Sequence, residues 1–416
     1  MQLITNSRLS SFRRCRRLHY FGYELLRRPR KISEALGFGT LFHVALEQWW
    51  LWHEAGSPRE GDPLEAALGA IMAKFAAVAE EAELNPYDLV KAEELMRGYH
   101  FRWRDTMVGY EVLGVESQFK IRLVNPLTGR PSPLWILSGK LDARVRVLDP
   151  DSVLFGKVLV VEHKTSTADV TPGSPYWNRL QMDGQISTYM DGSTSLPGGK
   201  PAGCLYDVSK RPGLRPKAAT PEEDIQYTQD KPARPGVPCK LCKAVQAAAA
   251  KESGVKLLVK DMKIDPGCEE CKPPRDAEPS RLYSGQRLEP ETPEEYRQRV
   301  REDISADPNG YFQRGDVVRL EEDLDEYRYD TWETAKELRL RQLAGNKLGI
   351  KAWPRDPGAC ERYGGFCDYY DVCTNRASID DDMLFRTAEK QHEELDDSVQ
   401  APESDEDDGL TSNEEE

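Results

Sequence analysis

The spacing of apolar and polar positions predicts helices in the first quarter of the chain and strands after it. Apolar residues from Leu41 to Trp50 recur at helical spacing and predict a helix over 38–54. Stretches rich in β-branched and apolar residues predict strands over 110–122, 134–148, 157–163 and 202–208. Further helices are predicted over 6–28, 63–83, 86–106 and 176–190. This order of elements predicts an α/β core with a mixed sheet flanked by helices.

The second half of the chain has a different composition. Residues 211–290 are rich in Pro and Gly and contain two Cys-X-X-Cys pairs, which predicts an insertion with its own small fold. Helical order returns at Thr292, the expected N-cap, with Pro293 at the first helical position and Glu295 completing a capping box. A longer helix is expected over 328–345. We therefore expect a core over 1–210, an insertion over 211–290, a helical part over 291–376 and an acidic, largely disordered tail over 377–416.

Charge is unevenly distributed along the 416 residues. The net charge is −14, but residues 391–416 hold 12 acids and no Lys or Arg. Residues 1–31 hold nine Lys and Arg against the single acid Glu24. A basic head is compatible with DNA binding, because the local potential matters more than the total charge. A solvated helix face is an equally open interpretation of its four central arginines, which are Arg13, Arg14, Arg16 and Arg17.

Leader, membrane and disulfide signals are weak in this sequence. No run of about 18 apolar residues is present, so no membrane span is expected. The first residues lack a basic and then apolar leader, so we expect a cytoplasmic or nucleoid-associated protein. In such a compartment, nine cysteines favour metal sites or free thiols over disulfides.

Asp142, Glu162 and Lys164 are the most informative residues for chemistry. Glu162 and Lys164 are two apart at the end of an apolar strand, so they project from the same face. If Asp142 comes from the adjacent strand, two carboxylates and an ammonium converge. That grouping suits a hard divalent cation beside a cation that steers a hydroxide nucleophile, as phosphodiester cleavage requires. The alternative is a set of solvated charges at strand ends, although charge beside a buried strand is costly without partners.

Two pairs of residues at helical spacing are weaker signals. His43 and Glu47 share one helix face, so His43 is either a partly buried histidine bonded to its neighbour or an additional metal ligand. Gln185 and Tyr189 form a similar pair, which alone would indicate ordinary surface or packing residues.

The cysteines form two sets. Cys360, Cys367 and Cys373 are close in sequence and require a fourth thiolate, for which Cys15 is the candidate. Four thiolates suit an iron–sulfur cluster or zinc, while three reduced structural cysteines are the alternative. The second set predicts a structural Zn²⁺ site in the insertion, because two Cys-X-X-Cys pairs supply four tetrahedral ligands. Its members are Cys239, Cys242, Cys268 and Cys271. Cys204 is expected to be a small buried residue.

Taken together, these segments resemble the RecB-like branch of the PD-(D/E)XK nuclease superfamily. They look most like the phage exonucleases and CRISPR-associated relatives that carry an iron–sulfur staple. The similarity covers roughly 5–210 and 290–375. The matching motifs are the opening helix from Ser7 through Cys15 to Tyr20, Gly39-Thr40-Leu41-Phe42-His43, Gly139-Lys140-Leu141-Asp142, Glu162-His163-Lys164, Gln185 to Tyr189, and the three C-terminal cysteines.

The resemblance implies a fold, an activity and cofactors. It implies a restriction-endonuclease-like core and an Mg²⁺- or Mn²⁺-dependent DNA nuclease, which we expect to be an exonuclease in recombination, DNA processing or defence. By resemblance, His43, Asp142, Glu162 and the His163 carbonyl bind the metal, Lys164 acts on the attacking water or the phosphate, and Gln185 and Tyr189 orient Lys164 or the strand. A [4Fe-4S] cluster is expected on Cys15, Cys360, Cys367 and Cys373, although their wide spacing leaves the cluster type open. The basic head would bind backbone phosphates.

A different class of function is also open. The chain would then be a non-catalytic iron–sulfur and zinc scaffold that binds DNA and assembles with recombination proteins, such as a single-strand annealing protein. Catalytically inactive relatives would be expected to lose Asp142 or Lys164, and this chain keeps both. No family function is carried over to the insertion, because its paired cysteines are not part of the general pattern.

Overall fold

The computed structural model describes residues 1–57, 59–225, 240–254, 262, 282, 285–362, 365–396 and 398–399. The chain divides into two compact units, and each is described by itself. Unit 1 comprises Met1–Gly213 and Arg297–Glu416, and unit 2 comprises Leu214–Tyr296. Of the four cysteines expected to bind zinc, only Cys242 falls within the described residues.

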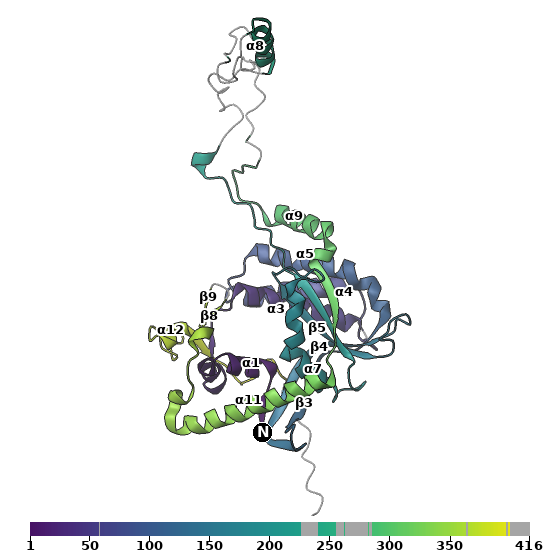
Figure 1. The fold of residues 1–416 in the computed structure, drawn as a ribbon, viewed down its shortest axis with the longest axis vertical. Helices are drawn as coiled ribbons and strands as arrows, with labels where there is room; N and C mark the ends of the chain where they lie inside the picture. Colours follow the sequence, from purple (N-terminus) through teal and green to yellow (C-terminus); the bar gives the residue numbers. More distant parts are fainter. Residues whose placement is uncertain are drawn as a thin grey trace, which may run out of the picture. The chain divides into compact units, whose positions relative to one another are not determined.

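A six-stranded mixed sheet forms the centre of unit 1 (Figure 1). Its strand order is β1-β4-β5-β6-β7, and β3 also pairs with β4. The β1–β4 and β5–β6 pairs are parallel, while the others are antiparallel. The sequence prediction of an α/β fold with a mixed sheet flanked by helices is therefore confirmed. The strand bounds are β1 Gln2–Ile4, β3 Tyr110–Val124, β4 Pro131–Val147, β5 Val158–Ser166, β6 Gly203–Lys210 and β7 Phe312–Val317.

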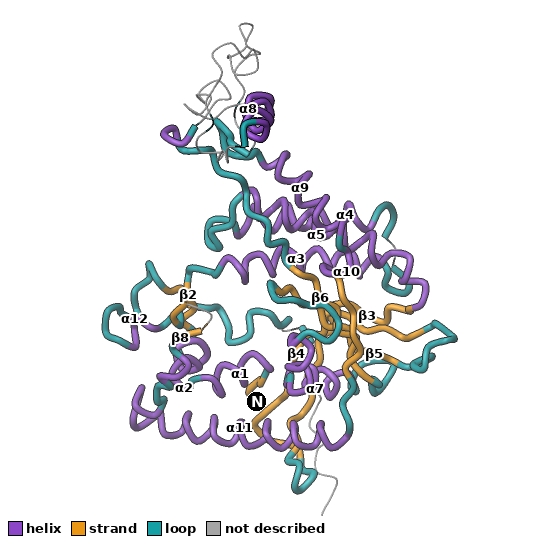
Figure 2. Tube along the Cα trace, turned by 45° about the horizontal axis from the view of Figure 1, so that its top comes forward, coloured by secondary structure: helices purple, strands orange, loops and turns teal. Residues whose placement is uncertain are grey.

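Two groups of helices pack against the two faces of the sheet. Successive residues of β5 point to opposite faces. Val160 belongs to a core shared with α1, α7 and α11, whereas the His163 ring lies 5.3 Å from the ring of Trp50 on α3. Figures 1 and 2 accordingly show α7 and α11 on one side of the strands and α3, α4 and α5 on the other. The bounds are α1 Asn6–Arg14, α3 Glu34–Trp52, α4 Pro63–Val78, α5 Pro86–Trp103, α7 Gly184–Ser193 and α11 Glu321–Leu348.

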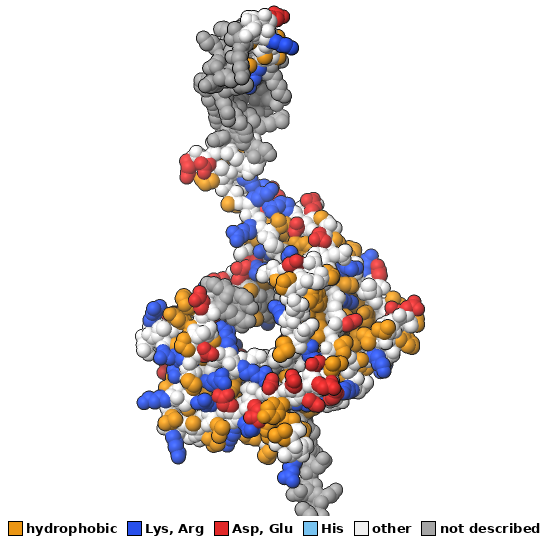
Figure 3. All heavy atoms as spheres, in the orientation of Figure 1, with side chains coloured by type: hydrophobic (Ala, Val, Ile, Leu, Met, Phe, Trp, Pro, Cys, Tyr) orange, Lys and Arg blue, Asp and Glu red, His pale blue; other side chains and the backbone are white. Residues whose placement is uncertain are grey.

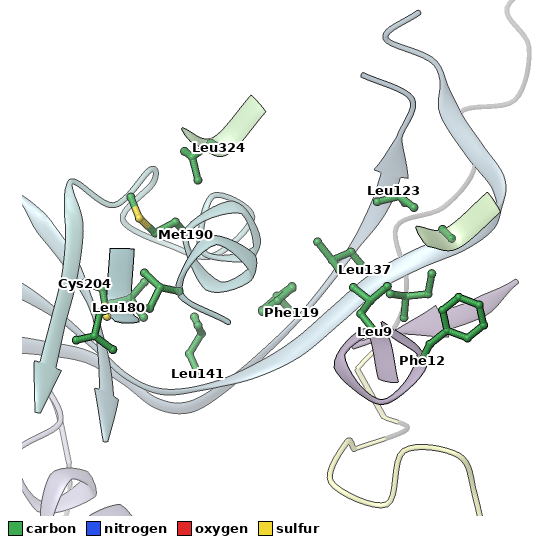
Figure 4. Close-up of a cluster of buried hydrophobic side chains, with 14 of the residues drawn as sticks. Leu9, Phe12, Phe119, Leu123, Leu137, Leu141, Leu180, Met190, Cys204 and Leu324 are labelled. Carbon is green, nitrogen blue, oxygen red and sulfur yellow. The ribbon is translucent and has the colours of Figure 1, made fainter. Parts of the chain in front are cut away.

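The core under α7 and α11 joins distant parts of the chain. Figure 4 shows Leu9 and Phe12 of α1, Phe119 of β3, Leu137 of β4 and Leu324 of α11 in this cluster. All five side chains are buried. Because apolar surface removed from water stabilises the fold at roughly 25 cal/mol per Å², this cluster fixes the N-terminal helix and the long C-terminal helix against β3 and β4.

Two predicted helices are interrupted. The helix expected over 6–28 breaks at Cys15, which has extended backbone angles between α1 and α2 (Arg16–His19) and is followed by a π-helical turn, Tyr20–Glu24. The helix expected over 176–190 consists of α6 (Pro175–Asn178), a 3₁₀ turn (Arg179–Met182) and α7. Asp183 begins α7 because its side chain accepts a hydrogen bond from Gln185 N–H at 2.8 Å. Gln185 therefore lies in the first turn of α7.

The described part of unit 2 contains a 3₁₀ turn, Glu222–Asp224, and α8, Lys240–Glu252. The helix α9 (Pro293–Ala306) begins in unit 2. Thr292 Oγ1 accepts from Glu295 N–H at 3.2 Å, and Glu295 Oε2 accepts from Thr292 N–H at 2.9 Å. The predicted capping box is therefore confirmed.

The expectation of disorder after residue 377 is wrong for 377–396. Here β10 (Phe385–Thr387) pairs antiparallel with β2 (Arg27–Pro29). His392 and Leu395 are buried, with 4% and 3% of their surface exposed. The acidic composition suggested a solvated tail, but these two side chains anchor it to the N-terminal part of unit 1. Within the described ranges, the structure has no helix that is both long and apolar enough to cross a membrane.

Short helices and strands complete the fold. They are α10 Pro308–Tyr311, α12 Tyr370–Cys373, β8 Glu361–Arg362, β9 Gly365–Phe366 and the 3₁₀ turns Arg104–Gly109, Gly349–Ala352 and Pro357–Ala359.

Candidate active site

Asp142 lies on β4 between the residues that pair with β1 and the residues that pair with β5. One edge of β4 is occupied by β3 along its length. On the other edge, β1 pairs with Trp135–Leu137 and β5 pairs with Ala143–Arg146. At the end of the β5 pairing, the Asp142 side chain replaces the backbone as acceptor, because His163 N–H donates to Asp142 Oδ2 at 2.7 Å. This hydrogen bond connects the end of β5 that carries Glu162 and Lys164 to Asp142.

Glu162 and Lys164 extend from β5 toward α7. Glu162 is 1% exposed, and the Lys164 ammonium donates to its Oε1 atom. The same ammonium donates to Gln185 Oε1 at 3.0 Å, and Gln185 Nε2 donates to the Tyr189 hydroxyl at 2.8 Å. The structure therefore joins Glu162, Lys164, Gln185 and Tyr189 in one chain of hydrogen bonds, with Asp142 beside it.

The electrostatics of this group favour an additional cation. Burial raises the pKa of the Glu162 carboxyl. The Lys164 ammonium lowers this pKa, and the Asp142 carboxylate raises it further. Burial alone would lower the pKa of Lys164, but the carboxylates of Glu162 and Asp142 outweigh it and raise that pKa. Lys164 is therefore held as a cation, while ionised Glu162 is costly in its buried position.

The donor chemistry fits a hard divalent cation. Among the described residues, Glu162 Oε2 is buried and has no hydrogen-bond partner. A buried carboxylate oxygen without a partner is unfavourable, and carboxylate oxygens are the ligands that Mg²⁺ and Mn²⁺ prefer. Within the described part of the chain, no group of three or more His, Cys, Asp or Glu side chains is already arranged to hold a metal ion. Coordination would thus require these side chains to move.

His43 approaches the site from α3. A Cβ atom at Gly39 would lie 3.5 Å from Thr165 Oγ1, so the start of α3 packs directly against the end of β5. One turn later, His43 interacts electrostatically with Asp142 and with Lys164. Burial lowers the pKa of His43 more than Asp142 raises it. The imidazole is therefore neutral at pH 7, the state in which a ring nitrogen can bind a metal.

The His163 side chain belongs to a different environment from its backbone. Its ring lies on the α3 side of β5, with Nδ1 3.5 Å from Asp207 Oδ2. Asp207 is buried and accepts hydrogen bonds from the Tyr99 hydroxyl at 2.6 Å and from Arg314 Nε at 3.0 Å. This buried network supports β5 on the face opposite the Glu162 and Lys164 side chains, and only the His163 backbone contacts Asp142.

Four residues near the site were not predicted to be functional from sequence. Asp183 interacts electrostatically with Glu162 and Lys164. Lys140 and Glu116 form an ion pair beside Asp142, and Glu47 acts electrostatically on both. Burial raises the pKa of Glu116, with Asp142 and Glu47 adding to the effect and Lys140 opposing it. Lys140 lies two positions before Asp142 in a strand. This spacing places both side chains on the same face, so the sequence could have predicted Lys140 at the site.

Of the four cysteines expected to bind iron and sulfide, Cys373 interacts electrostatically with the other three, but these described residues do not form a group already arranged to hold a metal. Cys15 stands at the break between α1 and α2, and Cys367 N–H donates to Cys360 O at 2.8 Å. Burial raises the pKa of the Cys373 thiol, and Cys15, Cys367 and Cys360 add to this effect. Residues 15 and 373 therefore interact although more than three hundred positions separate them.

The arginines of the basic head have structural partners in α11 and the segment after it. Arg16 makes two hydrogen bonds to the Glu337 carboxylate, at 3.1 and 2.8 Å. Arg13 donates to Thr334, Arg14 to the Ala359 carbonyl and Arg17 to the Trp353 carbonyl. These contacts hold α1 and α2 in place, and a role in phosphate binding stays a prediction.

Comparison with known proteins identifies the superfamily. A family model described as the PD-(D/E)XK nuclease superfamily matches residues 4–374. No curated protein matched the chain. The matched range contains the whole of the sheet from Ile4 onward, the Asp142, Glu162 and Lys164 group, and the C-terminal cysteines. The chain belongs to the PD-(D/E)XK nuclease superfamily.

Proposed function

We propose that this protein is a metal-dependent deoxyribonuclease that degrades DNA as an exonuclease. The observation that carries the proposal is the convergence of Asp142, Glu162 and Lys164 around a buried, unpartnered carboxylate oxygen in a chain of this superfamily. Membership of the superfamily supports a nuclease, with Mg²⁺ or Mn²⁺ as the usual metal. DNA as the substrate and exonuclease action belong to the proposal.

The metal would be held by Asp142, Glu162 and His43, with the His163 carbonyl as a further ligand. A bound divalent cation supplies Lewis-acid polarisation of the phosphoryl oxygen and lowers the pKa of water. The chain's own residues do the remaining work. Asp142 accepts the His163 N–H bond and so fixes the separation of β4 and β5, while Glu162 provides its free oxygen from a water-poor position.

Lys164 orients the nucleophile and balances the charge that develops on the phosphate. Its ammonium is aimed by two acceptors, Glu162 Oε1 and Gln185 Oε1. Preorganised charge of this kind is worth most where water is excluded. Gln185 and Tyr189 are positioning residues, because their hydrogen bonds act on Lys164 rather than on the reacting atoms.

The path of the substrate is also part of the proposal. In the space-filling view, one face of unit 1 is hollowed between α1 and α3, and Lys and Arg side chains border part of the hollow (Figures 1 and 3). A groove with basic borders attracts a polyanion and raises its local concentration. We infer that DNA approaches the catalytic strands through this hollow.

The cysteines are proposed to carry two further cofactors. The electrostatic interaction of Cys373 with Cys15, Cys360 and Cys367 supports an iron–sulfur cluster, proposed as [4Fe-4S], that ties the first helix to the C-terminal part. Zinc binding by Cys239, Cys242, Cys268 and Cys271 rests on their sequence spacing. Anaerobic purification followed by iron, sulfide and zinc analysis tests both, with about four irons and one zinc expected. A colourless protein without iron would contradict the cluster.

The nuclease proposal is tested with linear DNA carrying a label at one end. The wild type should release nucleotides with Mg²⁺ or Mn²⁺ and lose this activity with EDTA, while Asp142→Asn and Lys164→Ala should lose at least a hundredfold in kcat. Lys157→Ala, at an exposed lysine just before β5, is the matched control and should retain activity. Circular dichroism confirms folding. DNA binding by the wild type without cleavage with either metal would overturn the proposal and favour a non-catalytic DNA-binding scaffold.

A further inference from the structure

Lys140 is a second lysine at the catalytic strands with a different environment from Lys164. It lies two residues before Asp142 on β4 and directly opposite Gln118 on β3. Its ammonium forms an ion pair with Glu116. Glu116 lies on β3 between the residue that pairs with Ala143 and the residue that pairs with Leu141. The Lys140 and Glu116 side chains are 39% and 24% exposed, so the pair lies at the solvent side of the site.

The backbone of Glu116 is strained. Its φ angle is 51°, in the left-handed region that non-glycine residues avoid. Among the described non-glycine residues with positive φ, which are Leu26, Glu83, Glu116 and Asn375, it is the only one inside a strand. Such strain is maintained only where surrounding structure enforces it, and it is frequent at functional sites. Here it directs a carboxylate toward Lys140 beside the catalytic Asp142.

The two lysines differ in how firmly they are held. The Lys164 ammonium has two acceptors, one of which belongs to a buried glutamate. Among the contacts of the described residues, the Lys140 ammonium has one ion-pair partner, Glu116, in a more exposed position. Solvent-exposed ion pairs are weak because water screens the two charges, so another anion can displace the carboxylate at little cost.

We propose that Lys140 binds a phosphate of the DNA strand next to the scissile bond, and that this phosphate replaces the Glu116 carboxylate as its partner. The inference rests on the proposed function. Glu116 holds the lysine extended beside Asp142 until the strand arrives, so that little side-chain entropy is lost on binding. Lys140 thus determines where the backbone lies relative to Asp142 and Glu162.

Equilibrium binding with EDTA present tests the proposal without cleavage. The probe is a fluorescein-labelled oligonucleotide, and the dissociation constant is measured over a range of salt concentrations. Each phosphate contact contributes about 0.7 to the slope of log K against log salt for a single strand and about 0.9 for a duplex. For Lys140→Met, the slope should decrease by the contribution of about one phosphate contact, and the dissociation constant should rise about tenfold. Lys140→Arg should keep the slope and the dissociation constant of the wild type. Lys157→Met is the matched control and should equal the wild type.

The exchange of partners makes a prediction of opposite sign for Glu116. Glu116→Gln should bind DNA about threefold more tightly, because the competing negative charge is removed while the amide oxygen can still accept a hydrogen bond from Lys140. Glu111→Gln is the matched control: Glu111 forms an ion pair with Arg146 across the same two strands, at their other end. Equal changes in the two variants would contradict the exchange, because they would show only the loss of a negative charge.

A charge-neutral linkage locates the phosphate. Oligonucleotides with one methylphosphonate at successive positions should show a single position that weakens binding to the wild type but not to Lys140→Met. If Lys140→Met, folded by circular dichroism, has the affinity, salt slope and methylphosphonate profile of the wild type, the proposal is overturned. Failure of the nuclease proposal is distinguishable, since a wild type that binds but never cleaves would still show the slope difference.

Discussion

The Lys164 ammonium donates a hydrogen bond to Gln185 Oε1 at 3.0 Å, so the first turn of α7 directs the lysine at the end of β5. Gln185 can accept this bond in a fixed orientation because its amide nitrogen is committed to the Tyr189 hydroxyl at 2.8 Å. The position of Gln185 is set in turn by Asp183, which caps the helix. The orientation of Lys164, a proposed catalytic residue, therefore depends on where α7 begins.

Removing Gln185 should impair turnover more than substrate binding. We expect Gln185→Ala to lower kcat by about ten- to a hundredfold and to change KM by less than about threefold, because small misplacements of a catalytic group are costly. Tyr189→Phe should have a smaller effect in the same direction. Steady-state kinetics on end-labelled DNA measures both. Gln298→Ala removes a comparable helical pair with Glu302 on α9 and should leave kcat unchanged. An increase in KM alone for Gln185→Ala would contradict a positioning role.

Gly139 has a packing role that its position in the motif did not specify. A Cβ atom at Gly139 would lie 2.9 Å from two ring atoms of Phe119 and 3.3 Å from the Tyr189 ring. We expect Gly139→Ala to lower the free energy of unfolding by about 1–3 kcal/mol, as overpacking does, and to lower activity by displacing Tyr189. Denaturant unfolding measures the first effect. Gly69→Ala is the control, since Gly69 lies inside α4 with no atom near the added Cβ and should stabilise the protein by about 0.5–1 kcal/mol. Equal stability of Gly139→Ala and wild type would contradict the clash.

The sequence signals that correctly grouped residues in space were local and periodic. Glu162 and Lys164 share a strand face at a spacing of two, and Gln185 and Tyr189 share a helix face at a spacing of four. The structure connects all four by hydrogen bonds. Residue type and period are sufficient for such pairs, since the geometry within one element is fixed by its backbone.

The features that the sequence did not predict depend on distant partners. Nothing in the sequence around Cys15 signals a break, but Arg17 N–H donates to the Pro354 carbonyl at 3.2 Å, outside the helix. The short strands β2 and β10 pair across more than three hundred residues and have too few positions for a periodic pattern. Glu116 was missed because alternation along β3 says nothing of a left-handed backbone angle.

The buried His19 predicts a pH dependence of stability. Its side chain is 0% exposed, and its Nε2 accepts a hydrogen bond from Arg8 Nε at 3.3 Å, which requires the neutral ring. Burial, with the positive charges of Arg8 and Arg28 and the His392 ring, lowers the pKa of His19 to about 2. The Glu24 carboxylate lies 4.0 Å from His19 Nδ1.

The sign follows from linkage. In the unfolded chain the pKa of a histidine is about 6.5, so below that pH the unfolded state binds a proton that folded His19 does not. Stability from this residue is therefore complete above about pH 6.5 and decreases at lower pH by up to about 1.4 kcal/mol per pH unit. Urea unfolding at pH 7.5, 6 and 5 measures it. His19→Gln keeps an acceptor for Arg8 and should have a shallower slope; an unchanged slope would contradict the assignment.

Two truncations should separate the anchored from the acidic part of the C-terminal segment. Ending the chain after residue 390 removes buried His392 and Leu395 and the reciprocal hydrogen bonds between Gln118 and the Asp396 backbone, at 2.9 and 2.7 Å. We expect this truncation to lower the free energy of unfolding by about 2–5 kcal/mol, as loss of buried side chains does. Ending it after Val399 keeps His392, Leu395 and the Gln118–Asp396 hydrogen bonds and should change stability by less than about 0.5 kcal/mol.

The second truncation also tests whether the acidic residues restrain DNA binding. Residues 400–416 hold eight acids and no Lys or Arg. They follow a segment bound to Gln118, the cross-strand neighbour of Lys140, so the segment to which they are attached lies at β3, next to the proposed catalytic residue of β4. Ending the chain after Val399 should therefore tighten DNA binding severalfold at 0.01 M salt, where the Debye length is about 30 Å, and have no effect at 1 M, where it is about 3 Å. An unscreened polyanion attached beside a DNA site competes with DNA for that site. Equal affinities of the two chains at low salt would therefore exclude the restraint and leave solubility as the role of these acids.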